Sequence, residues 1–294
     1  MTTSFTLTRP APLPRQVPRR LLAKLWHHRS GRLGLILGLA LCLFAMVGAV
    51  WTPADPNQPN YINALKPPQL AHPFGTDATG RDMFSRSLDA AHRSLGAATL
   101  VLAAVFVIGL LIGTTAGLLG GVVDTVLMRT ADIAMTLPGL VLAFAVLGIL
   151  GPGFLNLLLA LIIADWAWYA RLARSLSLNA RHQPHVIAAR LAGVPNWRII
   201  CGHILPDVAL QLGIVASLAL GGMIGAISGF SFLGLGVQPP HAEWGAMLSE
   251  ARLYFTVALW LLIAPAGLIF LSVLSANLIG NALRDVAGAK DEQS

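Results

Sequence analysis

Charge is scarce in this sequence of 294 residues. Only 11% of the residues are Asp, Glu, Lys or Arg, whereas 55% are hydrophobic. A soluble globular domain has about 25% charged residues, so the composition excludes that class. The chain is therefore expected to be an integral membrane protein.

Cysteine is nearly absent as well. The two cysteines, Cys42 and Cys201, fall in an apolar run and in a polar stretch, and therefore at different depths of a membrane. No disulfide framework is expected.

Motifs for ATP hydrolysis and for histidine-based chemistry are lacking. Neither Gly-Lys-Ser nor Gly-Lys-Thr occurs, which excludes the phosphate-binding loop of an ATPase on this chain. The eight histidines all lie outside the long apolar runs, at positions 27, 28, 72, 92, 182, 185, 203 and 241. This placement provides no histidine base for a nucleophile inside the bilayer, which argues against an intramembrane hydrolase. We expect no catalytic residue, no metal site and no cofactor bound by this chain.

What the sequence does contain is a set of six apolar stretches. A helix needs about 20 such residues to cross a hydrocarbon core of about 30 Å. The stretches are Leu33–Trp51, Leu95–Leu119, Val126–Leu150, Leu155–Tyr169, Val208–Phe230 and Phe255–Ile279. The predicted fold is all-α, a polytopic membrane protein with six transmembrane helices.

The distribution of the basic residues predicts the topology. Arginine and lysine dominate residues 1–32 and the loop 171–206, whereas charges of both signs balance in residues 52–94. By the positive-inside rule the first two regions are cytoplasmic, and six spans place both termini there. The net charge of +7 thus reports topology rather than a nucleic-acid partner.

These patterns divide the chain into five parts. They are a basic cytoplasmic tail (1–32), a first transmembrane helix (33–51), an external loop (52–94), a five-helix core that includes the loop 171–206 (95–285) and a cytoplasmic tail (286–294). In the external loop, Phe84, Leu88 and Ala91 recur at helical spacing, which predicts an amphipathic helix leading into the second span. Asp82 and Arg86 are four residues apart and can pair on it. This helix is either a lid that stabilises the fold or a docking surface for an external partner.

Two further patterns concern helix contacts. Gly221, Gly225 and Gly229 give the fifth span a flat face that suits close packing in a bundle or a dimer. The run Ser231–Pro240 should end that helix and turn the chain into a short re-entrant or interfacial element.

The loop 171–206 carries the most informative motif. Small side chains at Ala188, Ala189 and Gly193 allow a helix to approach a partner closely, while Arg190 and Arg198 can reach acidic groups. With Ile204-Leu205-Pro206 after it, this stretch resembles the cytoplasmic signature loop of ABC importer permeases.

The resemblance implies a coupling helix that fits a groove of the ATP-hydrolysing subunit. The residues that it assigns to coupling are Ile187, Ala188, Ala189, Arg190, Gly193 and Arg198. Ile187 stands where the family usually has Glu, so one polar contact is missing. The resemblance further implies a type I importer architecture in the bacterial inner membrane, with a homologous permease, two subunits that bind ATP and Mg, and an extracytoplasmic solute-binding protein.

Several other motifs narrow the resemblance. His72–Arg86, Gly120–Asp132, Ser231–Pro240 and Asn277–Asp285 resemble permeases of the dipeptide, oligopeptide and nickel importers. Trp166–Arg171 and Ala242–Gly245 are similar to the nickel and metallophore branch, which implies nickel or a metal-chelator complex as solute. A peptide importer is the alternative. An ATP-independent channel or carrier fits less well, because it has no evident use for the long basic loop.

Acidic and sulfur-containing residues inside the predicted spans are the candidates for the pathway. Carboxylates within a membrane are costly and by default indicate function, which singles out Asp165 and Asp132. Met128, Asp132 and Met135 share one helical face and offer sulfur beside a carboxylate. The alternatives are structural: Asp132 pairs with Arg129, and Asp165 contacts neighbouring spans.

Overall fold

The structure is a computed structural model that describes residues 24–288. These residues form an all-helical fold without strands; only two isolated β-bridges occur, in the loop before α3. Residues 1–23 and 289–294, which carry most of the two predicted tails, lie outside the described residues.

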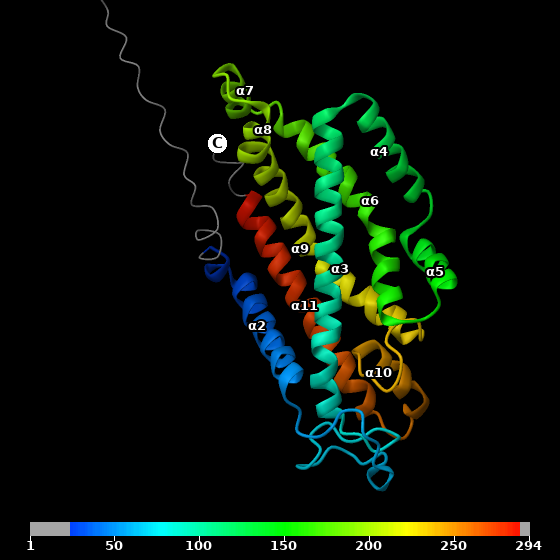
Figure 1. The fold of residues 1–294 in the computed structure, drawn as a ribbon. Coiled ribbons are helices and arrows are strands. Elements are labelled where there is room, and N and C mark those ends of the chain that lie inside the picture. The colour runs from blue at the N-terminus through cyan, green and yellow to red at the C-terminus, as the bar shows by residue number, and fades with distance from the viewer. Residues whose placement is uncertain (1–23, 289–294) are drawn as a thin grey trace, which may run out of the picture.

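The long helices follow the chain in a simple order (Figure 1). They are α2 (Arg29–Val50), α3 (Met83–Leu119), α4 (Gly121–Ala134), α5 (Gly139–Leu150), α6 (Phe154–Ala180), α9 (Leu205–Phe232) and α11 (Trp260–Gly288). Short helices connect them: α7 (Pro184–Leu191) and α8 (Asn196–Ile199) precede a π-helical turn (Ile200–Ile204), and α10 (Trp244–Ala251) follows α9.

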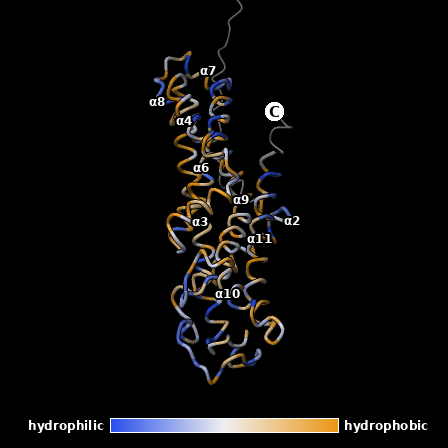
Figure 2. The backbone as a smooth tube through the Cα atoms, turned by 90° about the vertical axis from the view of Figure 1, so that its right-hand side faces the viewer, coloured by the Kyte–Doolittle hydropathy of each residue, from blue (hydrophilic) through white to orange (hydrophobic). Residues whose placement is uncertain are grey.

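The helices run along one axis between two distinct ends. Helices α7 and α8 lie at one end, the α7 end, and α10 and the loop before α3 lie at the other, the α10 end (Figure 1). Successive crossings alternate in direction, so α2 begins and α11 ends toward the α7 end. Apolar residues predominate along the helices, and polar ones at the ends (Figure 2). The described chain thus enters and leaves on the side of α7, as an even number of spans requires.

Five helices are long and apolar enough to cross a membrane alone, and the bent pair α4 and α5 gives up to six spans. The six-helix prediction is confirmed in number, but the third span is not one helix. Its two halves differ in direction by 82°. Pro138 explains the break, because proline lacks an N–H and disfavours helical backbone at Leu137 before it. The third predicted span, Val126–Leu150, is therefore corrected to a broken one.

Other boundaries also move. The predicted external helix and the second span form one helix of 37 residues, α3, which at 1.5 Å per residue is about 55 Å long. Its start therefore extends beyond the hydrocarbon core. Helix α6 continues to Ala180, well past Tyr169, so the first ten residues of the predicted loop 171–206 are helical. His92 lies in the first part of α3, before the predicted span Leu95–Leu119.

Close packing of α3 on α6 fixes the centre of the bundle. A Cβ on Gly109 would lie 2.4 Å from that of Tyr169, and one on Gly113 would lie 2.2 Å from the carbonyl oxygen of Ala170. Only glycine allows this approach, because any side chain would overlap the backbone of α6. The contact holds α6, and with it Asp165, at a fixed place in the bundle.

Candidate functional site

Charged residues of α4 and α6 meet near the α7 end. Both carboxylate oxygens of Asp124 accept from Arg174, whose Nη2 lies 2.6 Å from Oδ2. Asp132 pairs with Arg171 at 3.5 Å, and the same guanidinium reaches Met135 Sδ at 3.8 Å. The predicted pairing of Asp132 with Arg129 is therefore wrong. Arg129 lies on the same helix as Asp132, whereas Arg171 comes from the helix beside it.

Three of the predicted pathway residues lie at this surface. Met128 and Asp132 line a cavity of about 330 Å³ together with Arg171, Arg174 and Ser175. Met135 is the C-cap of α4, next to the bend. The face predicted from spacing thus exists, but two arginines of α6 neutralise its carboxylates.

Asp165, the fourth candidate, occupies a different place. It lines a cavity of about 280 Å³ between α6 and α9, with Trp168, Tyr169 and Met223 among its walls. Its Oδ1 also lies 3.5 Å from the position of a Cβ on Gly139, the first residue of α5. The structure therefore places Asp165 beside the broken span, apart from Met128, Asp132 and Met135.

The predicted coupling residues lie at the α7 tip, defined as residues 181–199. Ile187, Ala188, Arg190, Gly193 and Arg198 are exposed, whereas Ala189 is half-buried. Val186 and Ile199 are buried and anchor the tip to the bundle. Local sequence builds it: Pro184 starts α7 at a position that needs no N–H, and Gly193 ends the turn with a φ of 76°.

Large apolar side chains accompany the basic ones at this tip. Leu191 is 84% exposed and Trp197 62% exposed, and the Arg198 guanidinium lies 5.1 Å from the Trp197 ring centroid. Sequence reasoning missed Leu191 and Trp197, although both lie within the motif region. An exposed apolar patch that combines tryptophan with arginine is typical of a protein interface.

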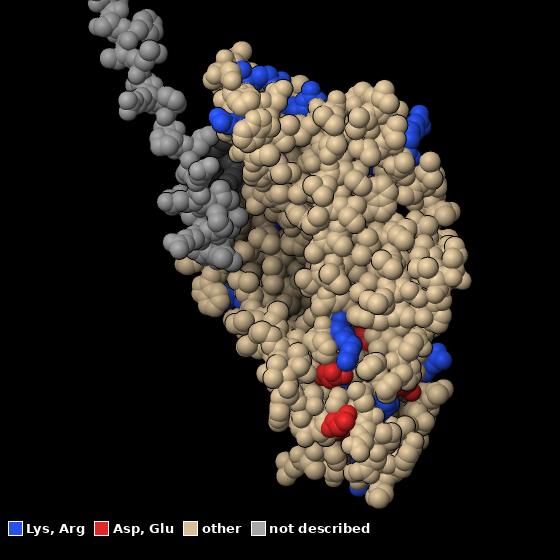
Figure 3. All heavy atoms as spheres, viewed as in Figure 1, with Lys and Arg blue, Asp and Glu red and all other residues tan. Residues whose placement is uncertain are grey.

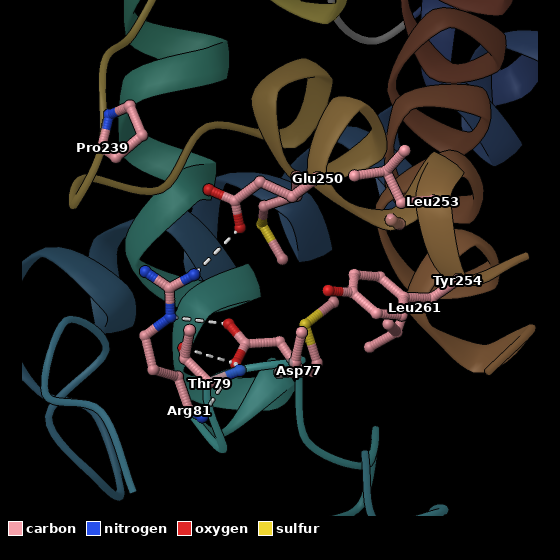
Figure 4. Close-up of a pocket in the computed structure, with 12 residues that line it drawn as sticks. Asp77, Thr79, Arg81, Pro239, Glu250, Leu253, Tyr254 and Leu261 are labelled. Carbon is pink, nitrogen blue, oxygen red and sulfur yellow. Dashed lines mark hydrogen bonds and ion pairs between the residues drawn. The ribbon is translucent and has the colours of Figure 1, made fainter. Parts of the chain in front are cut away.

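The opposite end is closed by ion pairs. The α10 cap consists of residues 52–82, the first turns of α3, and α10. Within it Arg81 pairs with Asp77 at 2.6 Å and with Glu250 at 3.0 Å (Figure 4). Arg86, fully buried, lies 2.9 Å from Glu250 and 3.6 Å from Asp77.

These contacts decide one prediction about this region and explain the titration of Asp77. The expected pair of Asp82 and Arg86 is wrong, because Asp82 is the N-cap of α3 and accepts from the Ser85 N–H at 2.8 Å. Burial alone would raise the pKa of Asp77, but the guanidiniums of Arg81 and Arg86 outweigh it and hold this pKa below its usual value. A cavity of about 370 Å³ opens beside the network, toward Tyr254 and Leu261 (Figure 4).

Glu243 is a buried carboxylate in the same cap that sequence reasoning did not single out. It accepts from Ser94 Oγ at 2.9 Å and from the N–H of Ala246 at 3.0 Å, as the N-cap of α10. Burial raises its pKa. Because the residues that usually signal an N-cap are Ser, Thr, Asp and Asn, a Glu before Trp244 gave no sequence signal for this role.

The segment Ser231–Pro240 ends α9 and turns the chain, as predicted, and only Ser231 and Phe232 of it are helical. Helix α9 ends at Phe232, the chain turns at Gly234, and α10 then packs against α9 and α11. Of the glycines predicted to form a flat face, Gly221 approaches Asn277 of α11, while Gly225 and Gly229 have open space in the described chain. Within the described chain, therefore, only the Gly221 part of this face packs closely against another helix.

The fold and these surfaces define an ABC importer permease, the class that the loop motif indicated. The sequence model of the family described as "binding-protein-dependent transport system inner membrane component" matches residues 109–285, more than half of the chain. The chain belongs to this family. The match begins within α3 and includes the α7 tip, the Asp165 cavity and α10.

Individual relatives fall into the nickel and the peptide groups. The chain is 42% identical over 256 residues to the nickel transport system permease protein NikC of Escherichia coli, covering 87% of this chain and 92% of that protein. It is 39% identical over 253 residues to the probable D,D-dipeptide transport system permease protein DdpC of Escherichia coli, covering 86% and 85%. The di/tripeptide transport system permease protein DppC of Pseudomonas aeruginosa is 36% identical over 293 residues, covering 96% of each chain.

Proposed function

We propose that this chain forms half of the translocation pathway of an ATP-driven importer for nickel or a nickel-chelator complex. The observation that supports this choice of solute is the 42% identity to a nickel permease over nearly the whole length of that protein. The stretches Trp166–Arg171 and Ala242–Gly245, which resemble that branch, support it. Trp168 and Arg171 line the two cavities of α6, so this resemblance concerns residues at the pathway.

The α7 tip is proposed as the docking site for the ATP-binding subunit. Its exposed apolar side chains, Leu191 of α7 and Trp197 of α8, each follow or precede an exposed arginine, Arg190 or Arg198, at one end of the bundle. The tip continues through the π-helical turn into α9 without a flexible linker. A displacement of the tip is thereby transmitted to α9, whose residues wall the Asp165 cavity. ATP and Mg belong to the partner subunits.

A homologous permease is proposed to cover the face of α4 and α6. Asp132 and Arg171 are about half exposed there, at 47% and 53%. Charged side chains in a spanning region face a bundle interior or water rather than lipid. Two such faces from paired permeases would enclose the pathway, with the binding protein delivering solute at the α10 end and both termini of the chain in the cytoplasm.

Uptake by the complete importer in proteoliposomes tests this function. Radioactive nickel with free histidine and a labelled dipeptide are supplied as separate solutes, with binding protein outside and ATP inside. We expect ATP-dependent nickel uptake and no dipeptide uptake. A complex whose ATP-binding subunits cannot hydrolyse ATP is the control. Uptake that persists in this control would contradict the importer function.

A peptide importer is the second candidate, because peptide permeases match the chain at 36 to 39% identity over comparable lengths. Dipeptide uptake without nickel uptake in the same assay would favour it. The coupling and pathway roles would then stand with a different solute.

A further inference from the structure

The Asp165 carboxylate differs from the two carboxylates of α4 because no basic side chain in the part of the chain that the structure describes pairs with it. Asp124 and Asp132 pair with Arg174 and Arg171, whereas Asp165 forms no hydrogen bond or ion pair within residues 24–288. Arg171 lies six residues further along α6, a rise of about 9 Å, and is engaged by Asp132. An unbalanced carboxylate in a spanning helix is costly, and it persists where it serves a function.

The walls of its cavity are suited to positive charge. Trp168 and Tyr169 pack edge to face with ring centroids 5.0 Å apart, and Met223 contributes a polarisable sulfur. Aromatic faces attract cations, and no Lys or Arg of the described residues lines the cavity. The remaining wall consists of Ala219, Gly222 and Ala226 of α9, whose small side chains leave the carboxylate accessible.

The cavity is large enough for one charged group of a solute but not for a whole large solute. Its volume is about 280 Å³, and a Cβ on Gly222 would meet nothing within 4 Å. The opening lies between α6 and α9, next to the bend of the broken span, where Gly139 starts α5. The cavity therefore lies where the span is interrupted, as expected of a site along a membrane pathway.

We propose that Asp165, Trp168 and Met223 bind the positively charged group of the solute as it passes the middle of the membrane. The proposal rests on the proposed function and deepens it by naming the chemistry of the solute. A metal ion or cationic chelate can supply this group, and so can the amino group of a peptide. The competing structural role is that Asp165 stabilises the start of α5 through its proximity to Gly139.

Charged thiol reagents test the site without any solute. Ala219→Cys, in a chain with Cys42→Ser and Cys201→Ser, is reacted with a cationic and an anionic methanethiosulfonate, and Leu70→Cys in the same background is the control. Leu70 is fully exposed in the loop before α3. A nearby unit charge favours the cationic reagent by about tenfold or more. We expect this preference at position 219 beyond that at position 70, and its loss on Asp165→Asn.

An unchanged preference in the Asp165→Asn chain would overturn the proposal, and so would a failure of position 219 to react with either reagent. A purely structural role of Asp165 predicts a lower melting temperature of the Asp165→Asn chain with no change in reagent preference. Because the labelling needs no transport, its result stands even if the proposed function fails.

Uptake by the complete importer provides a second test of the proposed site. With Asp165→Asn we expect uptake to fall at least tenfold, and with Asp165→Glu to stay within about threefold of the native chain. Asp55→Asn, an exposed carboxylate in the loop before α3, is the matched control and should not change uptake. Radioactive nickel with histidine and a labelled dipeptide are run separately, so the solute that responds identifies the source of the charge. Equal uptake by the Asn and native chains would contradict the site.

Discussion

The two ends of the bundle differ in whether their charged and large side chains are buried or exposed. At the α10 end, Arg86 and Glu243 are fully buried and each contacts polar partners within the chain, although Arg86 Nε has no hydrogen-bond partner among the described residues. At the α7 end, Leu191, Trp197 and Arg190 are exposed. On the face shown in Figure 3, basic residues gather at the α7 end and charges of both signs at the α10 end.

The difference indicates which end is complete and which needs a partner. A buried network of ion pairs stabilises only while all members are present, so the α10 cap is built to hold its own shape. An exposed cluster of leucine, tryptophan and arginine contributes little to folding of a single chain and becomes useful when another protein covers it. Substitutions at the two ends should therefore affect different measurements.

The largest expected effect on stability comes from Arg86→Ala in the cap. Removing this guanidinium takes one of two basic partners from buried Asp77 and half-buried Glu250, while Arg81 remains, so the unfolding free energy should fall by about 1.5 to 3 kcal/mol. The measurement is thermal unfolding of the purified chain in detergent, followed by tryptophan fluorescence. Arg252→Ala, an exposed arginine at the same end, is the control. Equal melting temperatures for the two variants would contradict the account of the cap.

The largest expected effect on coupling comes from Leu191→Glu at the α7 tip. An exposed residue is replaced, so the melting temperature should change little, while ATP-dependent uptake by the complete importer should fall more than tenfold. Leu70→Glu, an equally exposed leucine at the α10 end, is compared in the same uptake assay. If both variants transport like the native chain, the tip does not carry the coupling contact.

A smaller effect on the stability of the fold is expected from the titration of Glu243. Because its folded pKa is raised, the folded chain holds this proton longer than the unfolded chain, and stability falls as pH rises from the ordinary value of Glu through the folded pKa. Glu243→Gln removes this loss while the amide oxygen can still accept from a cap donor. We expect a flatter dependence of the melting temperature on pH above about 4.5. An unchanged slope would show that Glu243 does not titrate in this way.

The titration of Asp77 in the same cap should change stability with the opposite dependence on pH. Its folded pKa is lowered, so its contribution is present above the unfolded pKa and is lost as pH falls through the folded pKa. Asp77→Asn should therefore lower stability near neutral pH and reduce the loss on acidification. Melting curves between neutral pH and about pH 3 measure it, with Asp55→Asn as control. Matching acid profiles for the two variants would contradict the assignment.

The number of spans and the position of the tip could be predicted from the sequence, because both depend on local composition. Long apolar runs locate five of the spans. The extension of α6 past Tyr169 could not be predicted from hydropathy. Hydropathy locates the apolar part of a helix, whereas the helix itself can continue through polar residues into water. The bend at Pro138 had a visible signal, but the apolar run continues across it and conceals the break.

Pairings between helices were the least predictable part of the candidate site. The residues Asp132 and Arg171 are 39 positions apart, and only the packing of α4 on α6 brings them together. Spacing within one helix suggested Arg129 instead. Likewise, Asp82 has both a helix N–H and an arginine within local reach, and the N–H is the partner it takes. The lack of an ion pair between Asp165 and any basic side chain of residues 24–288 is a property of the assembled bundle alone.

Crosslinking at the two ends tests the central claim most directly. Ala188→Cys at the α7 tip and Leu70→Cys at the α10 end, each with Cys42→Ser and Cys201→Ser, are treated with a short bifunctional thiol reagent in the complete importer. The account predicts that Ala188→Cys is joined to the ATP-binding subunit, with a yield that changes when ATP binds, and that Leu70→Cys is not. Absence of this product from Ala188 and its neighbours on the tip, or its appearance from Leu70, would contradict the account.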